Sequence, residues 1–227
     1  MKILPQLNGS PNLKPGAKLR MNSNDIKIFL GDIPQDALDL ILKSPAVAWD
    51  IETSGLDWKS ERIATCQLCV SSSHVFLVQI NEGLPDRLKT LLSDNSVKKI
   101  FHHAMFDLKF MCHHWIVDPR NIACTKVAAK LLHPKDRGLQ SLKGLIKHYF
   151  GVNISKKERT SDWFARTLTD EQIAYAANDV IYLEKLLTKL EKELESRNLL
   201  EVARSCFEYI PTRVKLEVLG YDDVYKY

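Results

Sequence analysis

One stretch of the sequence indicates the fold: Ala46-Val-Ala-Trp-Asp-Ile-Glu-Thr-Ser-Gly-Leu56. The run from Ala46 to Ile51 is apolar except at Asp50, which is typical of a central strand buried on both faces. Because successive side chains of a strand point to opposite faces, Asp50 and Glu52 leave the same face. The sequence therefore places two carboxylates side by side at the end of a buried strand.

The segments around this strand predict a sheet covered by helices. Two apolar runs, Arg62 to Val70 and His74 to Ile80, are joined by consecutive serines, which predicts a β-hairpin. The capping box Thr169-Asp-Glu-Gln172 opens a long amphipathic helix. We therefore expect an α/β fold with a mixed sheet. The other predicted strands are 26–30, 98–101 and 121–124, and the other predicted helices are 35–43, 84–92, 105–114, 125–132, 139–150, 198–209 and 212–219.

The composition is that of an ordinary globular protein. The 227 residues are 45% hydrophobic and 26% charged, which excludes collagen-like, wholly disordered and membrane-spanning chains. The 32 Lys and Arg against 28 Asp and Glu give a net charge of +4, which tolerates a polyanionic partner without identifying one. We expect a flexible basic arm at 1–24, a core domain at 25–197 and a C-terminal helical extension at 198–227 packed on it.

Two features bear on the location of the protein. Residues 63–81 carry no charged side chain, but their polar residues favour the β-hairpin over a membrane span, so no membrane partner is expected. The five cysteines are an odd number in mostly apolar surroundings, which favours reduced thiols and a cytoplasmic protein. Cys66 and Cys69 lie in a predicted strand, where residues three apart face opposite sides, so a zinc or redox role is disfavoured.

Three more side chains extend the acidic pair. Asp107 begins the helix after strand 98–101, and Asp179 lies on the long helix with Tyr175 four residues before it. Residues four apart share a helical face, so this phenol and carboxylate lie together. Four carboxylates in one place need cations to neutralise them, and all-oxygen ligands favour Mg²⁺ or Mn²⁺ over zinc. A pair of such ions is suited to phosphodiester hydrolysis.

Each of these residues taken alone has an ordinary explanation. An Asp-x-Glu arises by chance in a chain of this size. Asp107 alone fits a partner of the helix dipole, and Tyr175 alone fits a buried aromatic residue. Only the combination on three separate segments points to catalysis.

The combination resembles the DEDDy branch of the DnaQ-like 3′–5′ exonucleases, which share an RNase H-like fold. The three motifs of that branch match Asp50-Ile-Glu-Thr-Ser-Gly-Leu56, His103-Ala-Met-Phe-Asp107 and Tyr175-Ala-Ala-Asn-Asp179. Ser161-Asp-Trp163 is similar to ribonuclease D, and Cys124-Thr-Lys126 looks closer to nano-RNase C, which degrades very short RNAs. The resemblance implies a mixed five-stranded sheet flanked by helices.

The resemblance also implies the catalytic residues, which are Asp50, Glu52, Asp107, Tyr175 and Asp179. The carboxylates of Asp50, Glu52 and Asp179 would hold one divalent cation, Mg²⁺ or Mn²⁺. Asp50 and Asp107 would share the second. Tyr175 would orient the attacking water, because a phenol with an ordinary pKa of about 10 is a poor base at neutral pH.

Contacts with the terminal nucleotide follow from the same resemblance. Gly55 would allow a close approach, and Leu56 would wedge against the base. His103 stands where relatives often carry Asn and would hydrogen-bond the nucleotide, with a packed histidine as the alternative, and Phe106 would stack on a base or pack in the core. The expected substrate-binding residues are Thr53, Gly55, Leu56, His103 and Phe106, and the basic residues Lys156, Lys157 and Arg159 would bind phosphates or stay solvated.

The sequence thus predicts a two-metal 3′–5′ exoribonuclease that hydrolyses short single-stranded RNA to nucleoside 5′-monophosphates, with dinucleotides as a candidate substrate. One alternative is a general ribonuclease-D-like enzyme that trims RNA 3′ ends, or an exonuclease of single-stranded DNA. Another is a non-catalytic nucleic-acid-binding module of the same fold, which the presence of all five site residues disfavours. A ring-like homo-oligomer is a further expectation, taken from nano-RNase C.

Overall fold

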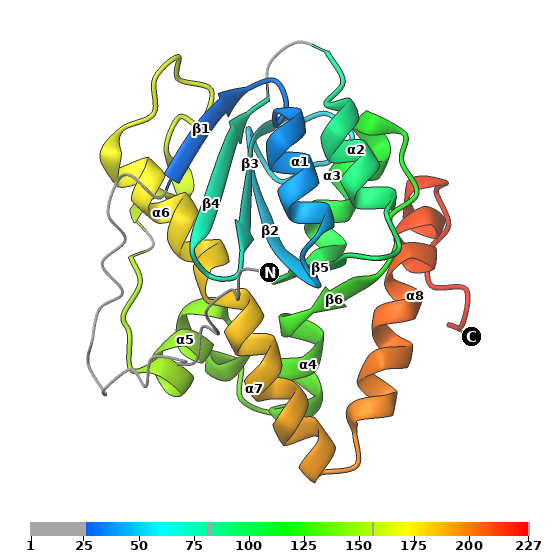
Figure 1. Cartoon of the computed structure of the whole chain (residues 1–227). Coiled ribbons are helices and arrows are strands. Elements are labelled where there is room, and N and C mark those ends of the chain that lie inside the picture. Colours follow the sequence, from blue (N-terminus) through cyan, green and yellow to red (C-terminus); the bar gives the residue numbers. More distant parts are fainter. Residues whose placement is uncertain (1–25, 81–82, 156, 227) are drawn as a thin grey trace, which may run out of the picture.

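A computed structural model of the chain describes residues 26–80, 83–155 and 157–226 (Figure 1). The expected basic arm at 1–24 lies outside the described residues. So does Lys156 of the expected basic cluster, and the side chain of Arg159 is not described either.

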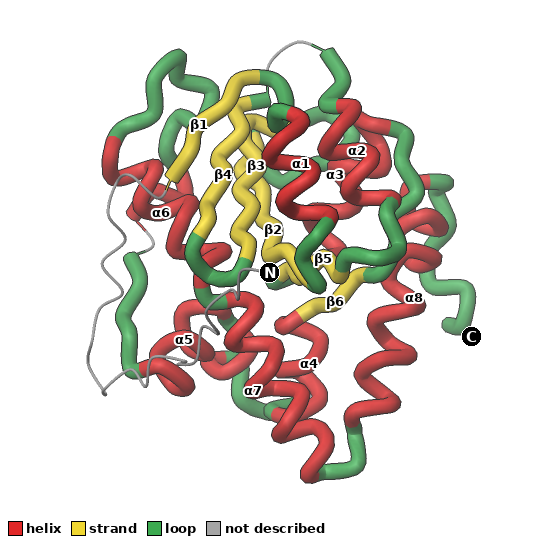
Figure 2. Tube along the Cα trace, in the orientation of Figure 1, coloured by secondary structure: helices red, strands yellow, loops and turns green. Residues whose placement is uncertain are grey.

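The strands form one mixed sheet in the order β1-β4-β3-β2-β5-β6 (Figure 2). β2 lies in the interior of the sheet, antiparallel to β3 and parallel to β5, while β5 and β6 are parallel. β3 and β4 form the predicted hairpin, and β1 adds to β4 in parallel. The bounds are β1 (Ile26–Leu30), β2 (Ala46–Thr53), β3 (Ile63–Val70), β4 (His74–Gln79), β5 (Lys98–Phe101) and β6 (Ile122–Cys124).

The mixed α/β sheet is confirmed, but across the described residues it has six strands in place of the five that the resemblance implied. The six-stranded order puts β1 at the edge beyond the hairpin, on the side away from β5 and β6. Only one edge of β1 is paired, and Ile28 and Leu30 remain 45% and 70% exposed. A strand at this position extends the sheet without touching the acidic strand β2.

Helices cover the sheet. α6 packs on β2, β3 and β4, α7 packs on β2 and β5, and α3 packs on β5 and β6. α8 runs beside α3, α4 and β6 at the far edge, as Figure 1 shows. The α-helices are α1 (Gln35–Leu42), α2 (Asp86–Ser93), α3 (Ala104–Trp115), α4 (Thr125–Leu132), α5 (Leu142–Phe150), α6 (Asp170–Ile181), α7 (Leu183–Ser196) and α8 (Leu200–Val218), with short 3-10 turns η2 (Gly138–Gln140) and η3 (Lys157–Thr160).

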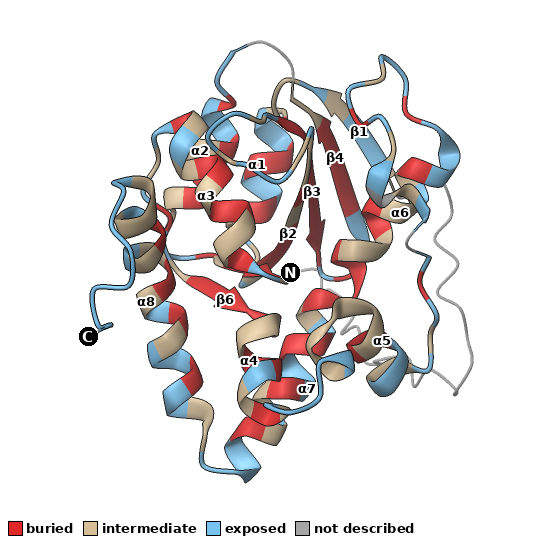
Figure 3. Cartoon of the chain, turned by 180° about the vertical axis from the view of Figure 1, so that it is seen from behind, coloured by how far each residue is buried: buried red, intermediate tan, exposed pale blue. Residues whose placement is uncertain are grey.

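The core lies on both faces of the central strands. Every residue of β3 is buried, as expected for a strand covered on both sides. Trp49 of β2 is fully buried and stacks on Phe101 of β5, with ring centroids 6.0 Å apart. Figure 3 shows the buried strands behind the helices, whose exposed residues face outward. The strand that carries Asp50 is therefore held rigidly.

Two helical predictions were wrong in detail. The long helix opens at the predicted capping box, but it is interrupted at Tyr182, whose ring packs on Phe150 with centroids 5.5 Å apart. The two short helices predicted at the C-terminus form the single helix α8, which continues through Pro211. A proline normally ends a helix because it lacks an N–H donor. Here the packing of α8 on α3, α4 and β6 keeps the helix continuous.

The structure also bears on location. No helix in the described part of the chain is long and apolar enough to cross a membrane. All five cysteines are free thiols, and Cys66, Cys69 and Cys124 are buried.

Candidate active site

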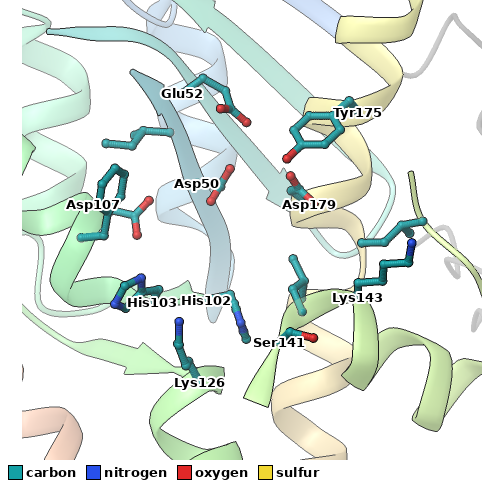
Figure 4. A pocket seen from close by; sticks show the side chains of 14 residues that line it. Asp50, Glu52, His102, His103, Asp107, Lys126, Ser141, Lys143, Tyr175 and Asp179 are labelled. Carbon is teal, nitrogen blue, oxygen red and sulfur yellow. The ribbon is translucent and has the colours of Figure 1, made fainter. Parts of the chain in front are cut away.

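A cavity of about 310 Å³ opens at the ends of β2, β5 and β6. Its lining comes from six regions of the chain and is shown in Figure 4, where the polar residues are labelled. In an open sheet with parallel strands, ligands bind in such a crevice outside the carboxyl ends of the strands. The lining residues are Asp50, Ile51, Glu52, His102, His103, Phe106, Asp107, Lys126, Ser141, Leu142, Lys143, Ile154, Tyr175 and Asp179.

β2 supplies Asp50 and Glu52 from one face, as the alternation of the strand predicts. Behind them, β3 provides Gln67 directly opposite Asp50 in the strand pairing. The Gln67 amide donates a hydrogen bond to Asp50 Oδ2 at 3.2 Å, and its carbonyl oxygen accepts one from Thr65 Oγ1 at 3.1 Å. Because Gln67 and Thr65 are completely buried, this chain of bonds fixes the orientation of the Asp50 carboxylate.

α3 brings Asp107 to the opposite side of Asp50. Asp107 lies in the first turn of the helix, where a negative charge interacts favourably with the helix dipole, and its side chain is buried. His103, the residue directly before α3, has a φ of +83°, a value that is unusual for a residue other than glycine. The sharp entry turns the chain from β5 into α3, so Asp107 and the ring of His103 both reach the cavity.

α6 supplies Asp179 and Tyr175 from the other wall. Oxygen atoms of Asp50, Glu52 and Asp179 all lie within 4.8 Å of one another, close enough to coordinate one cation. The Tyr175 hydroxyl donates a hydrogen bond to the Asp179 carboxylate, one helical turn further along. Trp163 backs the Tyr175 ring at a centroid distance of 5.9 Å and so limits its rotation.

The electrostatics of the acidic end favour protons or cations. Burial and then the neighbouring carboxylates raise the pKa of Asp50 well above its ordinary value. Burial and the charges of Asp179 and Asp107 raise the pKa of Glu52 to about 9. Burial raises the pKa of Asp107 to about 8. Ionised carboxylates this close to one another repel, and either protons or cations relieve that repulsion. The oxygen donors of the cluster fit divalent cations of the Mg²⁺ or Mn²⁺ type.

The opposite end of the cavity is cationic and polar. Figure 4 shows Lys126, His102, Ser141 and Lys143 together below the acids. His102 Nδ1 lies 2.9 Å from Thr125 Oγ1, and that hydroxyl donates to the carbonyl of Phe101. Nδ1 of His102 is therefore the donor in this pair. Burial, followed by the charge of Lys126, lowers the pKa of His103 to about 4, so this ring is neutral at pH 7.

The structure brings most of the predicted site residues together. Asp50, Glu52, Asp107, Tyr175, Asp179, His103 and Phe106 all line the cavity. Among the described residues, Thr53, Gly55 and Leu56 stand outside the lining. Thr53 ends β2, Gly55 and Leu56 lie on the loop that follows, and Leu56 is 84% exposed. Lys157 lies in η3 and is likewise absent from the lining.

Several residues in or behind the lining have no role in the sequence-based prediction. Gln67 supports Asp50 from behind, and no charged motif marks it, because its position opposite Asp50 comes from the pairing of β2 with β3. Lys126 follows the short strand β6, and Ser141 and Lys143 open α5. A lysine two residues after a strand of the predicted sheet was the signal that sequence reasoning could have used, since β6 ends beside β5, the neighbour of β2.

A family model described as 3′–5′ exonuclease matches residues 28–195. The chain belongs to this 3′–5′ exonuclease family. Ribonuclease D of Escherichia coli is 30% identical over 186 residues, which is 80% of this chain and 48% of that protein. The chain thus spans about half the length of that curated relative.

Solved structures of 3′–5′ exonucleases agree with this assignment. Brucella melitensis NrnC is 34% identical with a TM-score of 0.83, and the match covers 90% of this chain and 100% of that one. Structures of the same Brucella protein contain pGG in one case and Mg²⁺ in another. Escherichia coli RNase D is 26% identical with a TM-score of 0.72, over 84% of this chain and 50% of that one. The predicted resemblance to ribonuclease D and nano-RNase C is confirmed.

Proposed function

We propose that this protein is a metal-dependent 3′–5′ exoribonuclease that hydrolyses short RNA, with dinucleotides among its substrates, to nucleoside 5′-monophosphates. One observation carries the proposal. Residues from β2, α3 and α6 place four carboxylates and a phenol in the wall of a single cavity. Retention of the complete set is what hydrolysis requires, and a module that only binds nucleic acid has no need of it.

Two divalent cations, Mg²⁺ or Mn²⁺, fit the donor set. Asp50, Glu52 and Asp179 would hold one of them, since their oxygens converge within 4.8 Å. Asp107, on the other side of Asp50, would share the second cation with it. When bound, such cations stabilise the charge that develops on the phosphate and make a water molecule more acidic. The binding of Mg²⁺ by Brucella NrnC supports this assignment.

Tyr175 would position the attacking water. Burial and the charges of Asp179 and Glu52 raise the pKa of the Tyr175 hydroxyl above its ordinary value, so the phenol keeps its proton at neutral pH. A protonated phenol that donates to Asp179 can accept a hydrogen bond from a water molecule with its remaining lone pairs. Tyr175 therefore orients the water, and a basic role for the phenolate is disfavoured.

The cationic end of the cavity supports a short substrate. Lys126 and Lys143 lie on the side away from the acids, where they would bind a phosphate that is not cleaved. The acidic end of the cavity would bind the 3′ nucleotide that is cleaved off, and the cationic end would bind a terminal 5′-phosphate. An RNA of about two nucleotides would reach from one end to the other. Brucella NrnC bound to pGG supports this proposal. His103 and Phe106, in the wall between the two ends, would contact a nucleoside. Thr53, Gly55 and Leu56 would reach it from the end of β2 and the loop that follows.

A length series tests the proposed function. The purified full chain is incubated with 5′-labelled oligoribonucleotides of two to about ten nucleotides and with the matching DNA, with Mg²⁺ or with a chelator. We expect cleavage of the two-mer at the highest rate, loss of one nucleotide at a time from the 3′ end, and no cleavage with chelator. Equal rates at all lengths would favour a general ribonuclease-D-like trimming enzyme, and faster turnover of DNA would favour a DNA exonuclease. Binding without any cleavage would indicate a non-catalytic module.

Two expectations about the setting of the enzyme stay as proposals. A cytoplasmic location is consistent with the five free thiols. A ring-like homo-oligomer is supported by apolar side chains that the C-terminal part leaves exposed, including Leu219 at 64% and Tyr225 at 69%. The division into an arm at 1–24, an exonuclease domain at 25–197 and an extension at 198–227 is also retained, with α8 as the main element of that extension.

A further inference from the structure

The loop between β2 and β3, residues 54–62, is closed at its neck by hydrogen bonds. The amide of Ser54 donates to the carbonyl of Arg62 at 3.0 Å, and the amide of Arg62 donates to Ser54 Oγ at 2.9 Å. The Ser54 hydroxyl in turn donates to the carboxylate of Glu61. This β2–β3 loop therefore returns on itself directly after the strand that carries Glu52.

The side chain of Glu61 fixes the shape of the turn that presents Leu56. A Cβ atom on Gly55 would come within 2.8 Å of Glu61 Cδ, so the Glu61 side chain lies flat against the Gly55 backbone. Leu56 itself is 84% exposed and gains little from packing. The place of Leu56 relative to the cavity is thus set through Glu61 and not by contacts of its own.

Glu61 is held in turn by α3. Nε2 of His114 lies 2.7 Å from the carbonyl oxygen of Glu61. A carbonyl oxygen can only accept, so Nε2 carries the hydrogen in this bond. The His114 ring stacks on Phe110 at 6.1 Å, and Phe110 contacts Phe106 at 5.1 Å. These three rings lie four residues apart on one stripe of α3 that begins in the wall of the catalytic cavity.

The other flank of the loop is joined to the opposite wall. The guanidinium of Arg62 lies over the ring of Phe164 at 4.9 Å, and the neighbouring Trp163 backs Tyr175. The β2–β3 loop is therefore tied to both α3 and the segment before α6. On the α3 side, the loop backbone is held by the hydrogen bond of His114, and the ring of Trp58 also contacts His113 at 5.1 Å.

We propose that His114 is a positioning residue for nucleotide binding: its hydrogen bond to Glu61 holds the β2–β3 loop so that Leu56 meets the terminal nucleotide. This inference rests on the proposed function, because it takes the loop as a wall of the substrate site. His114 itself is outside the cavity lining and touches no reacting atom. Its effect is on substrate affinity, and turnover of bound substrate is left unchanged.

The test compares three variants of the full chain. His114→Leu removes the donor, His114→Gln replaces it with an amide N–H, and His74→Leu removes an exposed histidine on the β3–β4 hairpin as a matched control. With pGpG as substrate, we expect KM to rise about tenfold in His114→Leu with kcat within about twofold of the wild type, the pattern of lost uniform binding. His114→Gln should bring KM back to within about twofold of the wild type. The control His74→Leu should have the KM of the wild type.

Hydrogen exchange separates this inference from the proposed function, because it needs no activity. In His114→Leu, we expect faster exchange of the loop amides, those of Glu61 and Arg62 above all, while the amides of β3 exchange as before. Unchanged loop exchange would overturn the inference, and so would an unchanged KM in an active enzyme. A fall in kcat with constant KM would also overturn it, because His114 would then act on catalysis. A wild type that cleaves no RNA would refute the proposed function instead.

Discussion

At the scale of single residues, the acidic end of the cavity is a set of charges that the fold holds together against repulsion. The carboxylate oxygens of Asp50, Glu52 and Asp179 converge within 4.8 Å of one another. Burial makes the ionised forms of Asp50 and Glu52 still less favourable. A fold gains no stability from such a cluster, so the arrangement is explained by the cations and the phosphate that it would bind.

Asp107→Asn tests this explanation. The amide keeps the shape of the side chain but removes a charge that would neutralise a cation. We expect kcat to fall about 100-fold or more, because several kcal/mol of charge stabilisation are lost. The melting temperature should stay the same or rise, since a buried carboxylate is removed. Asp118→Asn, which changes an exposed acid paired with Lys215, is the control and should keep full activity. Near-normal turnover of Asp107→Asn would remove Asp107 from the metal site.

At the scale of elements, the sequence predicted what depends on local chemistry. The alternation in β2, the hairpin and the Thr169 capping box are local patterns, and the structure contains all three. The misses depend on distant packing. Two helices were predicted at 198–209 and 212–219, whereas the single helix α8 continues through Pro211 because other elements support it. The six strands predicted one by one all form, whereas the resemblance implied a five-stranded sheet, because which strands join a sheet is not visible in a strand's own residues.

The candidate site divides in the same way. The acids were predictable because chemistry requires carboxylates and their spacing fits recognisable motifs. Lys143 and Gln67 were not, because a lysine or a glutamine acquires its role only from what the fold places opposite it. His114 is a stronger example, since its partner is a backbone carbonyl 53 residues away along the chain. Backbone partners leave no trace in the side-chain pattern.

A second prediction concerns the contact between η2 and α5. A Cβ atom on Gly144 would lie only 2.0 Å from the carbonyl oxygen of Gly138, so the two backbones touch directly. Gly144→Ala must push them apart, and it would move Ser141, whose hydroxyl bridges both by accepting from Gly144 N and donating to Gly138 O. We expect a loss of about 1–3 kcal/mol in the free energy of unfolding, the usual cost of overpacking, which exceeds the helix propensity gained.

Urea unfolding measures that loss, and KM for a dinucleotide should rise with it because Ser141 and Lys143 line the cavity. Gly138→Ala is the matched control. Its Cβ would meet Asp136 Oδ1 at 3.1 Å, the end of a side chain that can turn away. If Gly144→Ala and Gly138→Ala lower the free energy of unfolding by the same amount, the close approach of η2 and α5 has no special role in stability.

At the scale of the whole molecule, a rigid sheet is combined with a site assembled at one end of it. β3 is buried on both faces and β2 is mostly buried, while the residues that would meet substrate come from β2, α3, α4, α5 and α6. Such a site forms only when the whole fold is assembled. The stability of the complete chain and the geometry of the cavity are therefore linked.

Lys99 makes that overall stability dependent on pH. Its side chain is completely buried in β5, and its ammonium group donates to the carbonyl of Asp94. Burial lowers the pKa of Lys99 from 10.5 to about 8, with the charge of Asp94 opposing the change. Between these pH values the unfolded chain binds a proton that the folded chain has lost, so this group makes stability rise as the pH increases from about 8 to 10.5.

Lys99→Met removes this dependence. Relative to the variant, the wild type should gain at most about 3 kcal/mol in free energy of unfolding over that pH range, because each pKa unit is worth about 1.4 kcal/mol. Urea unfolding at several pH values measures the difference. Lys98→Met, which removes a partly exposed neighbour paired with Glu191, controls for the loss of a positive charge and should parallel the wild type. The free energies of unfolding of the wild type and Lys99→Met would instead change in parallel with pH if the carbonyl of Asp94 stabilised the buried ammonium group as effectively as water does. Burial of Lys99 would then carry no cost in stability.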